Sequence, residues 1–475
     1  MYLPCRVRKL KKFNEYSDRP VKVTNVKWRF YRVESDRVIA LLDPSSVRTK
    51  CDALECETDR IKSSKNVDEL VTMAHLAGEH MKEMGLIAGQ VIPIIDVDDS
   101  TDRPCSKNET KTREKRQETN NYCVEFLVQE PSSKRANIQV GIDNLGEGQA
   151  TASASFASVF GRAENLEVEY VHGHRGTTQC RVSFNKPLLG WQRYTTLGGN
   201  VYRWTASLPQ SGFSHINTGF SAEAWHRQHR HLDHIFRWHY DWRQLQPDQN
   251  SSFAVREHAG HSLKSSLQHV VTLKTQDNDV LPRRGLLATL TNELASSWFG
   301  GDVRLWSSQL DMRATSPLPF GVILSCGLRG RYVAPMGGRS LSLLDRTFLG
   351  GPFDLRGFPL RRVGPTAGAN AVGGNASYAL AMHLFRSLYP ADLVYAHVFA
   401  CAGTVQPIEP NQPSALLQTI GRMTSADARV SVGVGLALRL GSIARLELNY
   451  CVPLQSRTTD AAHAGVQFGI GTDFL

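Results

Sequence analysis

A glycine-rich segment places one arginine at the tip of a long connection. Residues 349–358 read Leu-Gly-Gly-Pro-Phe-Asp-Leu-Arg-Gly-Phe, so that Arg356, Gly357 and Phe358 follow a Gly-Gly-Pro turn. The connection runs from about residue 332 to 373, and a loop of this length is typical of a functional segment rather than a simple turn. We therefore interpret it as an ordered loop that presents one cation for binding, with an ordinary connecting loop as the alternative.

Two other segments contain residue types that bind metals or phosphates, but their spacing argues against such sites. Five histidines lie between Trp225 and Trp242, yet strand residues three or five positions apart point to opposite faces and do not converge on a metal. Gly433 and Gly435 lie inside an alternating strand pattern, whereas a phosphate-binding loop needs a glycine turn between a strand and a helix. We found no GxxxxGK[ST], HExxH or GxSxG motif, so we expect no enzyme activity, no cofactor and no metal.

The composition excludes several classes of protein. The 475 residues are 41% hydrophobic and 21% charged, which rules out a disordered chain, a collagen and a coiled coil. The mean hydropathy is −0.30, and no apolar run approaches the roughly 18 residues of a membrane-spanning helix. The nine cysteines are an odd number without a Cys-x-x-Cys pair, which argues against a disulfide framework and a zinc site. The net charge of +10 is spread along the chain, which argues against a nucleic-acid partner.

The first 130 residues predict a basic arm followed by a small α+β domain. Residues 1–20 are basic and lack the apolar stretch of a secretory signal, so we interpret them as a disordered arm rather than a mitochondrial presequence. In residues 21–30 apolar and polar side chains alternate as in a strand. From Leu70 to Met84 the apolar residues recur at helical spacing, and Asn66 is placed to cap this helix. The domain, residues 21–130, is completed by two strands and a polar, charged insertion, at 91–97, 122–128 and 101–120.

The rest of the chain, residues 137–475, follows a linker at 131–135 and alternates apolar with polar residues in many short segments. One face is aliphatic and aromatic, and the other is Gly, Arg, Glu, His and Asn. A soluble sandwich needs two apolar inner faces, whereas apolar residues around a polar interior fit a closed barrel in lipid. At about 21 residues per strand and connection, the segment has room for about 16 strands. We predict an all-β transmembrane barrel of about 16 antiparallel strands after one small α+β domain; a soluble all-β protein is the alternative.

The long loop and several other segments resemble a known family. A Gly-Gly-Pro turn followed by Arg-Gly-Phe before the last five strands of a barrel resembles the BamA superfamily of bacterial outer-membrane insertases. By order and size, residues 21–130 are similar to one POTRA domain of that superfamily. Segments similar to the animal core channel subunits of the mitochondrial sorting and assembly machinery are residues 261–267, 281–285, 300–303 and 439–453.

The resemblance implies a function, a location and partners. It implies assembly and insertion of β-barrel precursor proteins into the mitochondrial outer membrane, with the POTRA domain in the intermembrane space. The implied partners are β-barrel precursors, metaxin-type peripheral subunits, the TOM complex, the MICOS inner-membrane organising complex and the lipid bilayer. A passive porin-like channel is the alternative, although it would not need the α+β domain or the long loop. A protein-conducting import pore is a further alternative, although it would normally carry several POTRA domains.

The resemblance also implies roles for individual residues. Arg356, Gly357 and Phe358 would form the tip of a loop that folds back into the barrel lumen. The bacterial branch has an Asp in the following F-x-D-x-G strand, where this chain has Cys401. We expect Glu447 to pair with Arg356 instead, because the alternation places Glu447 on the lumen face. The family's C-terminal assembly signal is matched at Gln467, Gly469 and Phe474, with Thr472 where a larger apolar residue is usual.

Such a barrel closes by pairing its first strand with its last, and we expect this seam to be its weakest junction. Both strands are rich in glycine and have few strong cross-strand pairs. An opened seam would expose unpaired N–H and C=O groups, on which an incoming strand can pair without leaving backbone polar groups bare in lipid. We expect Phe474 to face the lipid and Gly469 to face the lumen. The predicted seam residues are Ile138, Val140 and Ile142 on the first strand and Gln467, Gly469 and Phe474 on the last.

Overall fold

The computed structural model describes most of the chain as two compact units. One unit comprises residues 1–135 with 155–166 and 184–193, and the other comprises the rest. The predicted basic arm and the charged insertion up to Thr119 lie outside the described residues. None of the described helices is both long enough and apolar enough to cross a membrane. The described residues are 21–34, 37–41, 47–97, 120–142, 147–190, 194–338, 340–388, 393–408, 427–441, 444–471 and 474–475.

In the described residues, the N-terminal α+β region consists of a four-stranded sheet and two α-helices. The sheet has the order β2-β1-β4-β3, in which β1 runs parallel to β4 and the other pairs are antiparallel. This arrangement of elements is consistent with one POTRA domain. Its elements are β1 (Val21–Glu34), β2 (Arg37–Leu41), α2 (Cys51–Thr58), the 3-10 helix η2 (Ile61–Ser63), α3 (Val67–Glu83), β3 (Ala88–Val97) and β4 (Asn120–Gln129).

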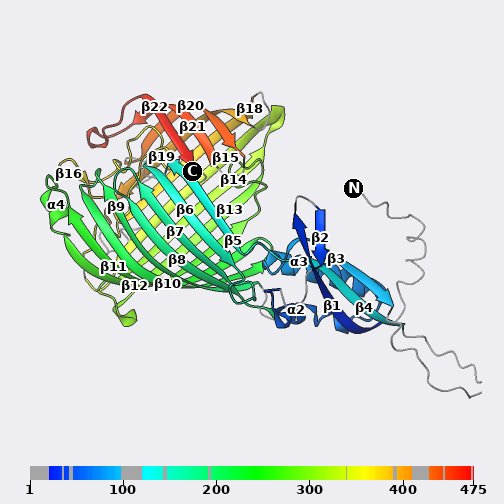
Figure 1. Cartoon of the computed structure of the whole chain (residues 1–475). Coiled ribbons are helices and arrows are strands. Elements are labelled where there is room, and N and C mark those ends of the chain that lie inside the picture. The colour runs from blue at the N-terminus through cyan, green and yellow to red at the C-terminus, as the bar shows by residue number, and fades with distance from the viewer. Residues whose placement is uncertain are drawn as a thin grey trace, which may run out of the picture. The chain divides into compact units, whose positions relative to one another are not determined.

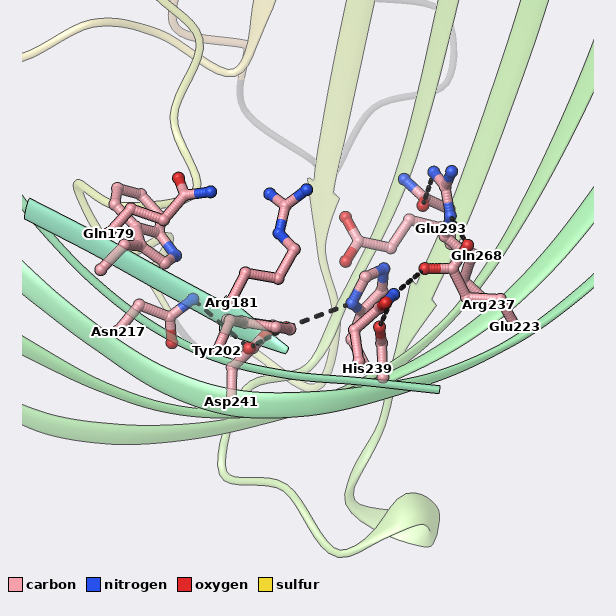
Figure 2. A pocket seen from close by; sticks show the side chains of 13 residues that line it. Gln179, Arg181, Tyr202, Asn217, Glu223, Arg237, His239, Asp241, Gln268 and Glu293 are labelled. Atoms are coloured by element: carbon pink, nitrogen blue, oxygen red, sulfur yellow. Dashed lines mark hydrogen bonds and ion pairs between the residues drawn. The ribbon is translucent and has the colours of Figure 1, made fainter. Parts of the chain in front are cut away.

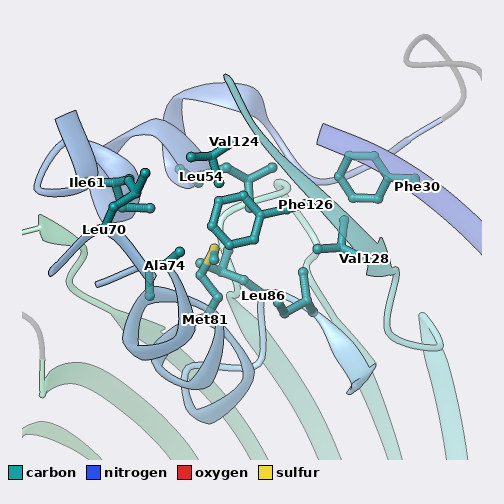
Figure 3. Close-up of a cluster of buried hydrophobic side chains, with 13 residues drawn as sticks. Phe30, Leu54, Ile61, Leu70, Ala74, Met81, Leu86, Val124, Phe126 and Val128 are labelled. Atoms are coloured by element: carbon teal, nitrogen blue, oxygen red, sulfur yellow. The ribbon is translucent and has the colours of Figure 1, made fainter. Parts of the chain in front are cut away.

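The core of this region forms between α3 and β4. Leu70 and Met81 of α3 belong to the same fully buried cluster as Phe126 of β4 (Figure 3). The ring of Trp28 on β1 stacks on that of Phe126, with their centroids 4.6 Å apart. The helical spacing in the sequence therefore identified the buried face of α3 correctly.

Asn66 is the N-cap residue of α3 as expected, but the side-chain capping that was expected of it is wrong. Asn66 occupies the N-cap position with an extended backbone, but its side chain makes no capping hydrogen bond. Instead the Glu69 carboxylate accepts a hydrogen bond of 2.8 Å from the backbone N–H of Lys65. Gly85 follows the helix with a φ of +76°, which suits a residue without a Cβ.

The second part of the chain is a 16-stranded sheet, and the predicted barrel is confirmed (Figure 1). Consecutive strands are neighbours throughout, except that β16 (Thr366–Ala367) and β17 (Asn370–Ala371) form a separate pair between β15 and β18. The first strand begins at Lys134, inside the segment that the sequence predicts as a linker. A helix of four residues, α4 (Phe253–Arg256), lies between β11 and β12.

The strands of the barrel are β5 (Lys134–Ile142), β6 (Gly148–Ala157), β7 (Asn165–Gly173), β8 (Thr178–Pro187), β9 (Thr195–Leu208), β10 (Phe213–His229), β11 (Leu232–Pro247), β12 (Gly260–Lys274), β13 (Gly285–Ala295), β14 (Leu305–Pro317), β15 (Val322–Pro335), β18 (Ala376–Ser387), β19 (Val394–Gln406), β20 (Arg429–Leu440), β21 (Ala444–Gln455) and β22 (Gly465–Gly471).

The two faces of the strands have the alternation that the sequence predicts. On β21, Leu448 and Tyr450 point outward and are about half exposed, whereas Glu447 and Asn449, which alternate with them, are completely buried. Phe468 on β22 is opposite Leu448 and is likewise exposed. Apolar residues on the outer face fit a hydrocarbon environment, and polar residues on the inner face fit a polar lumen.

The sheet is open between its first and last strands. β5 and β22 are the two ends of the strand order, and no pairing between them is found in the described residues. Figure 1 shows these ends in cyan and red. A seam is therefore visible at the junction that the sequence predicts to be the weakest. The described part of β22 comprises seven residues, and residues 472–473 after it lie outside the described residues. We call this junction between β5 and β22 the seam.

Candidate functional site

The long connection between β15 and β18 brings the Arg-Gly-Phe tip against the inner face of the barrel. It runs from residue 336 to 375, because Tyr332 to Pro335 still belong to β15. Two isolated bridges, Thr347 with Gly374 and Leu349 with Val363, order its middle part. We call residues 336–375 the lumen loop and Arg356, Gly357 and Phe358 its tip.

Arg356 and Glu447 form a buried ion pair. The Nε and Nη2 atoms of Arg356 donate to one carboxylate oxygen of Glu447 over 3.2 and 2.9 Å. Both side chains are completely buried. The third donor, Nη1, reaches the backbone carbonyl of Leu475 at 3.3 Å. The structure thus brings together the arginine of the tip and the carboxylate that the sequence predicts as its partner.

Glu447 has a second arginine beside it. The Nε of Arg445 lies 3.0 Å from the other carboxylate oxygen of Glu447. The Asn449 amide also donates to Glu447 over 3.0 Å. Arg445 lies over the ring of Phe474 at 4.3 Å from its centroid, and Arg356 lies 5.7 Å from the same centroid. The electron-rich face of that ring adds to the stabilisation of two buried cations that share one carboxylate.

The backbone of the tip is held by β20 and β22. Gln467 accepts a hydrogen bond from the N–H of Gly357 and donates one to the carbonyl of Phe358, each over 2.9 Å. The hydroxyl of Ser431 donates to the carbonyl of Arg356. Gln467 lies on the strand that borders the seam, so the tip is attached directly to the edge of the sheet.

Gly357 has to be a glycine at this position. Its φ is +87°, and a Cβ added there would lie 3.1 Å from the Cβ of Ser431 and 3.4 Å from that of Cys451. The close approach lets the neighbouring Phe358 enter an apolar cluster that includes Leu349 and Leu355. Cys401, at the position of the missing Asp, is buried in the same cluster and so contributes packing there.

The outward orientation expected for Phe474 is wrong. β22 ends at Gly471, and Phe474 is completely buried, with its ring 4.8 Å from that of Phe353 in the lumen loop. The backbone N–H of Leu475 donates to the carbonyl of Phe353 over 3.0 Å. The two-residue alternation therefore does not continue past the end of the strand. Thr472 lies outside the described residues.

The predicted site residues fall into two groups. Gln467, Gly469, Phe474 and Glu447 surround the tip, and a Cβ on Gly469 would lie 3.0 Å from Phe474. The residues of the first strand are elsewhere: Ile138 and Val140 are 79% and 84% exposed on β5, and Ile142 ends that strand.

Several residues that contact the tip or Glu447 were not predicted from the sequence. Arg445 and Asn449 are two positions from Glu447 on the same face of β21, so their spacing could have indicated them. Ser431 lies on another strand, and its sequence gives no signal that it contacts the tip.

Another part of the lumen contains a pocket of about 620 Å³ that is lined by polar side chains (Figure 2). The Tyr202 hydroxyl donates to Asp241 over 2.6 Å, and the Asn217 amide donates to the same carboxylate over 3.3 Å. Arg237 pairs with Glu223 at 3.2 Å. In this pocket the charges of Arg237 and Glu223 are paired with each other, whereas the Asp241 carboxylate accepts hydrogen bonds from uncharged donors.

Comparisons with known proteins agree with this architecture. The Omp85 superfamily domain matches residues 159–474. The chain is 33% identical over 442 residues to the Sorting and assembly machinery component 50 homolog B of Xenopus laevis. It has the same identity, over 442 residues, to the Sorting and assembly machinery component 50 homolog of Homo sapiens. Each alignment covers 90% of this chain and 88% of the relative.

A solved structure has the same fold. The crystal structure of BamA from Haemophilus ducreyi lacking POTRA domains 1–3 superposes with a TM-score of 0.73 at 16% identity, covering 95% of this chain and 84% of that one. The chain therefore belongs to the Omp85 superfamily and, within it, to the family of the Sorting and assembly machinery component 50 homologues.

Proposed function

We propose that the chain assembles β-barrel precursor proteins and inserts them into the mitochondrial outer membrane. The observation that carries this proposal is the seam, where β5 and β22 are unpaired in the described residues. An unpaired strand edge has a row of free N–H and C=O groups, which a precursor strand can pair with. Pairing there keeps the precursor's backbone polar groups out of contact with hydrocarbon. Membership in a family named for a sorting and assembly machinery supports this activity.

The proposed reaction needs neither a nucleotide nor a covalent step. Each hydrogen bond that a precursor strand forms at the seam replaces a bond to water or an unpaired group, so pairing itself favours insertion. The tip supports this proposal because Gln467 joins it to the strand that would accept the precursor. Depletion of ATP after the precursor has reached the intermembrane space is expected to leave its assembly rate unchanged.

The proposal includes a location and partners. The POTRA domain would lie in the intermembrane space and meet precursors that arrive through the TOM complex. Metaxin-type subunits and the MICOS complex are the proposed stable partners. Affinity purification of the tagged chain from mitochondria solubilised in mild detergent tests these associations, and the absence of both partners would contradict them.

Depletion of the chain tests the function most directly. Mitochondria without the chain are expected to import a radiolabelled porin precursor but to assemble it much more slowly into a carbonate-resistant, protease-protected barrel. A precursor destined for the matrix and an outer-membrane protein with one helix serve as controls and should be unaffected. Normal porin assembly would contradict the proposal and favour a passive channel.

A reversible cross-link tests the seam separately. Ile138→Cys and Phe468→Cys place thiols at the exposed midpoints of β5 and β22. Joining them with a cleavable bifunctional reagent is expected to block porin assembly, and reduction should restore it. The matched control joins Leu448→Cys to Phe468→Cys, which are opposite each other on the paired strands β21 and β22. Equal inhibition by both cross-links would contradict the proposal that assembly depends on opening of the seam.

A further inference from the structure

The part of the lumen loop before the tip is attached to a different region of the barrel. Leu343 is buried in an apolar cluster with Phe213 of β10 and Leu245 of β11. Farther along the loop, Asn370 accepts a hydrogen bond of 2.8 Å from the backbone N–H of Ser252. The loop is therefore packed at its base as well as at its tip.

Asp345 makes the charged contact at this base. The Nη1 and Nη2 atoms of Arg243 donate to its two carboxylate oxygens over 2.8 and 3.1 Å. The ammonium of Lys264 donates to the same carboxylate over 3.2 Å and lies 2.8 Å from Glu293. The side chains of Arg243 and Asp345 are only 7% and 3% exposed. A bidentate arginine–carboxylate pair fixes the relative orientation of the two side chains as well as their distance, so it can hold a loop in one orientation.

The charged state of Asp345 is well supported by its surroundings. Burial alone would raise the pKa of its carboxyl, but Lys264 and Arg243 outweigh this effect and hold the pKa far below its usual range. The loop therefore presents an anion to two cations of the wall at neutral pH.

Lys264 is positioned by two of the segments that resemble the family. It lies in residues 261–267, and residues 300–303 pack against that segment. The backbone N–H of Asp302 donates to the carbonyl of Leu263 over 2.7 Å. In return, the Asp302 carboxylate accepts a hydrogen bond of 3.2 Å from the backbone N–H of Leu263. A Cβ on Gly301 would lie 2.6 Å from the backbone nitrogen of Ser265, so only glycine permits this contact. The two segments together fix the strand that carries Lys264.

The two attachments of the loop are on opposite sides of the barrel. Glu447 is on β21 and Arg243 is on β11, which is the eighth strand from β21 in the order of the 16-stranded sheet. In a barrel of 16 strands, eight steps lead half way around the wall. The lumen loop thus spans from the wall beside the seam to the wall opposite it.

We propose that Asp345, held by Arg243 and Lys264, is a far-wall anchor that positions the tip of the lumen loop at the seam. This inference rests on the proposed function, because the tip is the part that contacts the seam strand. With the anchor intact, the tip cannot follow β22 when the seam opens, so opening has to separate Arg356 from Glu447. Without the anchor, the loop would move with β22 and would no longer oppose or guide the opening.

Two matched substitutions test the anchor. Asp345→Asn and Glu293→Gln each remove one negative charge beside Lys264, but only Asp345 belongs to the loop. Asp345→Asn is expected to slow porin assembly at least about tenfold, because Arg243 loses its carboxylate in a buried site, and Glu293→Gln to have a clearly smaller effect. Both variants are compared at equal amounts of carbonate-resistant protein.

Limited trypsin digestion provides a readout that does not depend on precursor assembly. The loop contains Arg346, Arg361 and Arg362, and cleavage there is expected to rise at least fivefold in Asp345→Asn relative to wild type and Glu293→Gln. If Asp345→Asn does not integrate, Arg243→Lys provides a milder test, because it keeps the charge and loses the two-pronged geometry. Unchanged cleavage, or equal effects of the two matched variants, would overturn the anchor. Increased cleavage with normal porin assembly would support the anchor as a loop attachment and contradict its role in the proposed function.

Discussion

At the scale of single residues, Glu447 is unusual because its one carboxylate neutralises two buried arginines. Arg356 belongs to the loop and Arg445 to the barrel wall, and each is within 3.0 Å of a different carboxylate oxygen. Removing one member of a buried ion pair leaves the other charge in a medium that solvates it poorly. The consequences of substitution should therefore differ between the two partners of the tip pair.

Glu447→Gln is expected to slow precursor assembly at least as much as Arg356→Ala, because it leaves two arginines without their carboxylate. Removing one partner of a buried ion pair destabilises a protein by about 3–5 kcal/mol. Arg356→Lys should restore assembly only in part, since an ammonium cannot reproduce three donors in a planar fork. The rate of porin assembly in mitochondria that contain only the variant measures these effects. Additive losses in the double variant would show that the two residues do not act as a pair.

Gly357→Ala is expected to impair assembly more than Gly368→Ala. Both glycines belong to the lumen loop and have a positive φ, so an alanine meets about the same backbone strain of roughly 1–2 kcal/mol at either position. Only at Gly357 would the new Cβ press on Ser431 and Cys451, whereas nothing lies within 4 Å of a Cβ on Gly368. Porin assembly and thermal denaturation of the two purified variants measure the difference, and equal effects would mean that the packing of the tip is unimportant.

The residues of the site were only partly predictable. Period-2 alternation was sufficient to place Glu447 in the lumen, because β21 pairs with β20 in regular register from Ala444 to Pro453. The same rule failed for Phe474, because β22 ends at Gly471 and the rule holds only within a strand. The contacts of Ser431 and Asp345 depend on how a long loop folds back, which local spacing does not encode.

At the scale of elements, β22 is a short strand with one narrow face. Gly465, Gly469 and Gly471 alternate with the outward Val466 and Phe468. The narrow face leaves room for the lumen loop, since a Cβ on Gly469 would lie 3.1 Å from Pro352. The length of the strand and its small residues both limit how strongly it can hold a neighbour at the seam.

Gly469→Leu is expected to block membrane integration of newly imported protein, because the leucine would collide with Phe474 and Pro352 on the inner face. Gly465→Leu provides the matched control on the same face, where the nearest atom, in His463, is 3.8 Å from the added Cβ. Carbonate extraction after import into isolated mitochondria measures integration. Normal integration of Gly469→Leu, or equal failure of both variants, would contradict this account of the strand.

Elements with strong periodicity were predicted, and irregular ones were not. The helical spacing from Leu70 to Met84 corresponds to α3, and the alternation after residue 137 corresponds to the barrel. β2 and α2 were missed by the pattern, since α2 has only eight residues and no clear apolar stripe. The position of the seam was predicted from the order of the strands, but whether it rests open or closed was not, because strand pairing depends on edges that are distant in sequence.

At the scale of the whole molecule, the lumen loop connects the two sides of a barrel that is open along one line. A sheet with a seam can widen, because the two end strands are not joined in the described residues. A loop that is held at β21 and at β11 opposes such widening from inside. The same loop also reduces the free cross-section of the lumen, so its attachment should affect the passage of ions.

The loop is expected to restrict conductance only while both ends are held. In planar bilayers, the purified double variant Arg356→Ala with Asp345→Asn should have a conductance several-fold higher than wild type, because the loop can leave the lumen. Each single variant should have an intermediate conductance, since one charged attachment and its apolar contacts remain. Glu293→Gln is the control, because it changes a charge of the wall and leaves both attachments of the loop in place. A double variant with wild-type conductance would show that the loop is held by other contacts. A single variant with the full increase would show that one attachment alone holds the loop in the lumen.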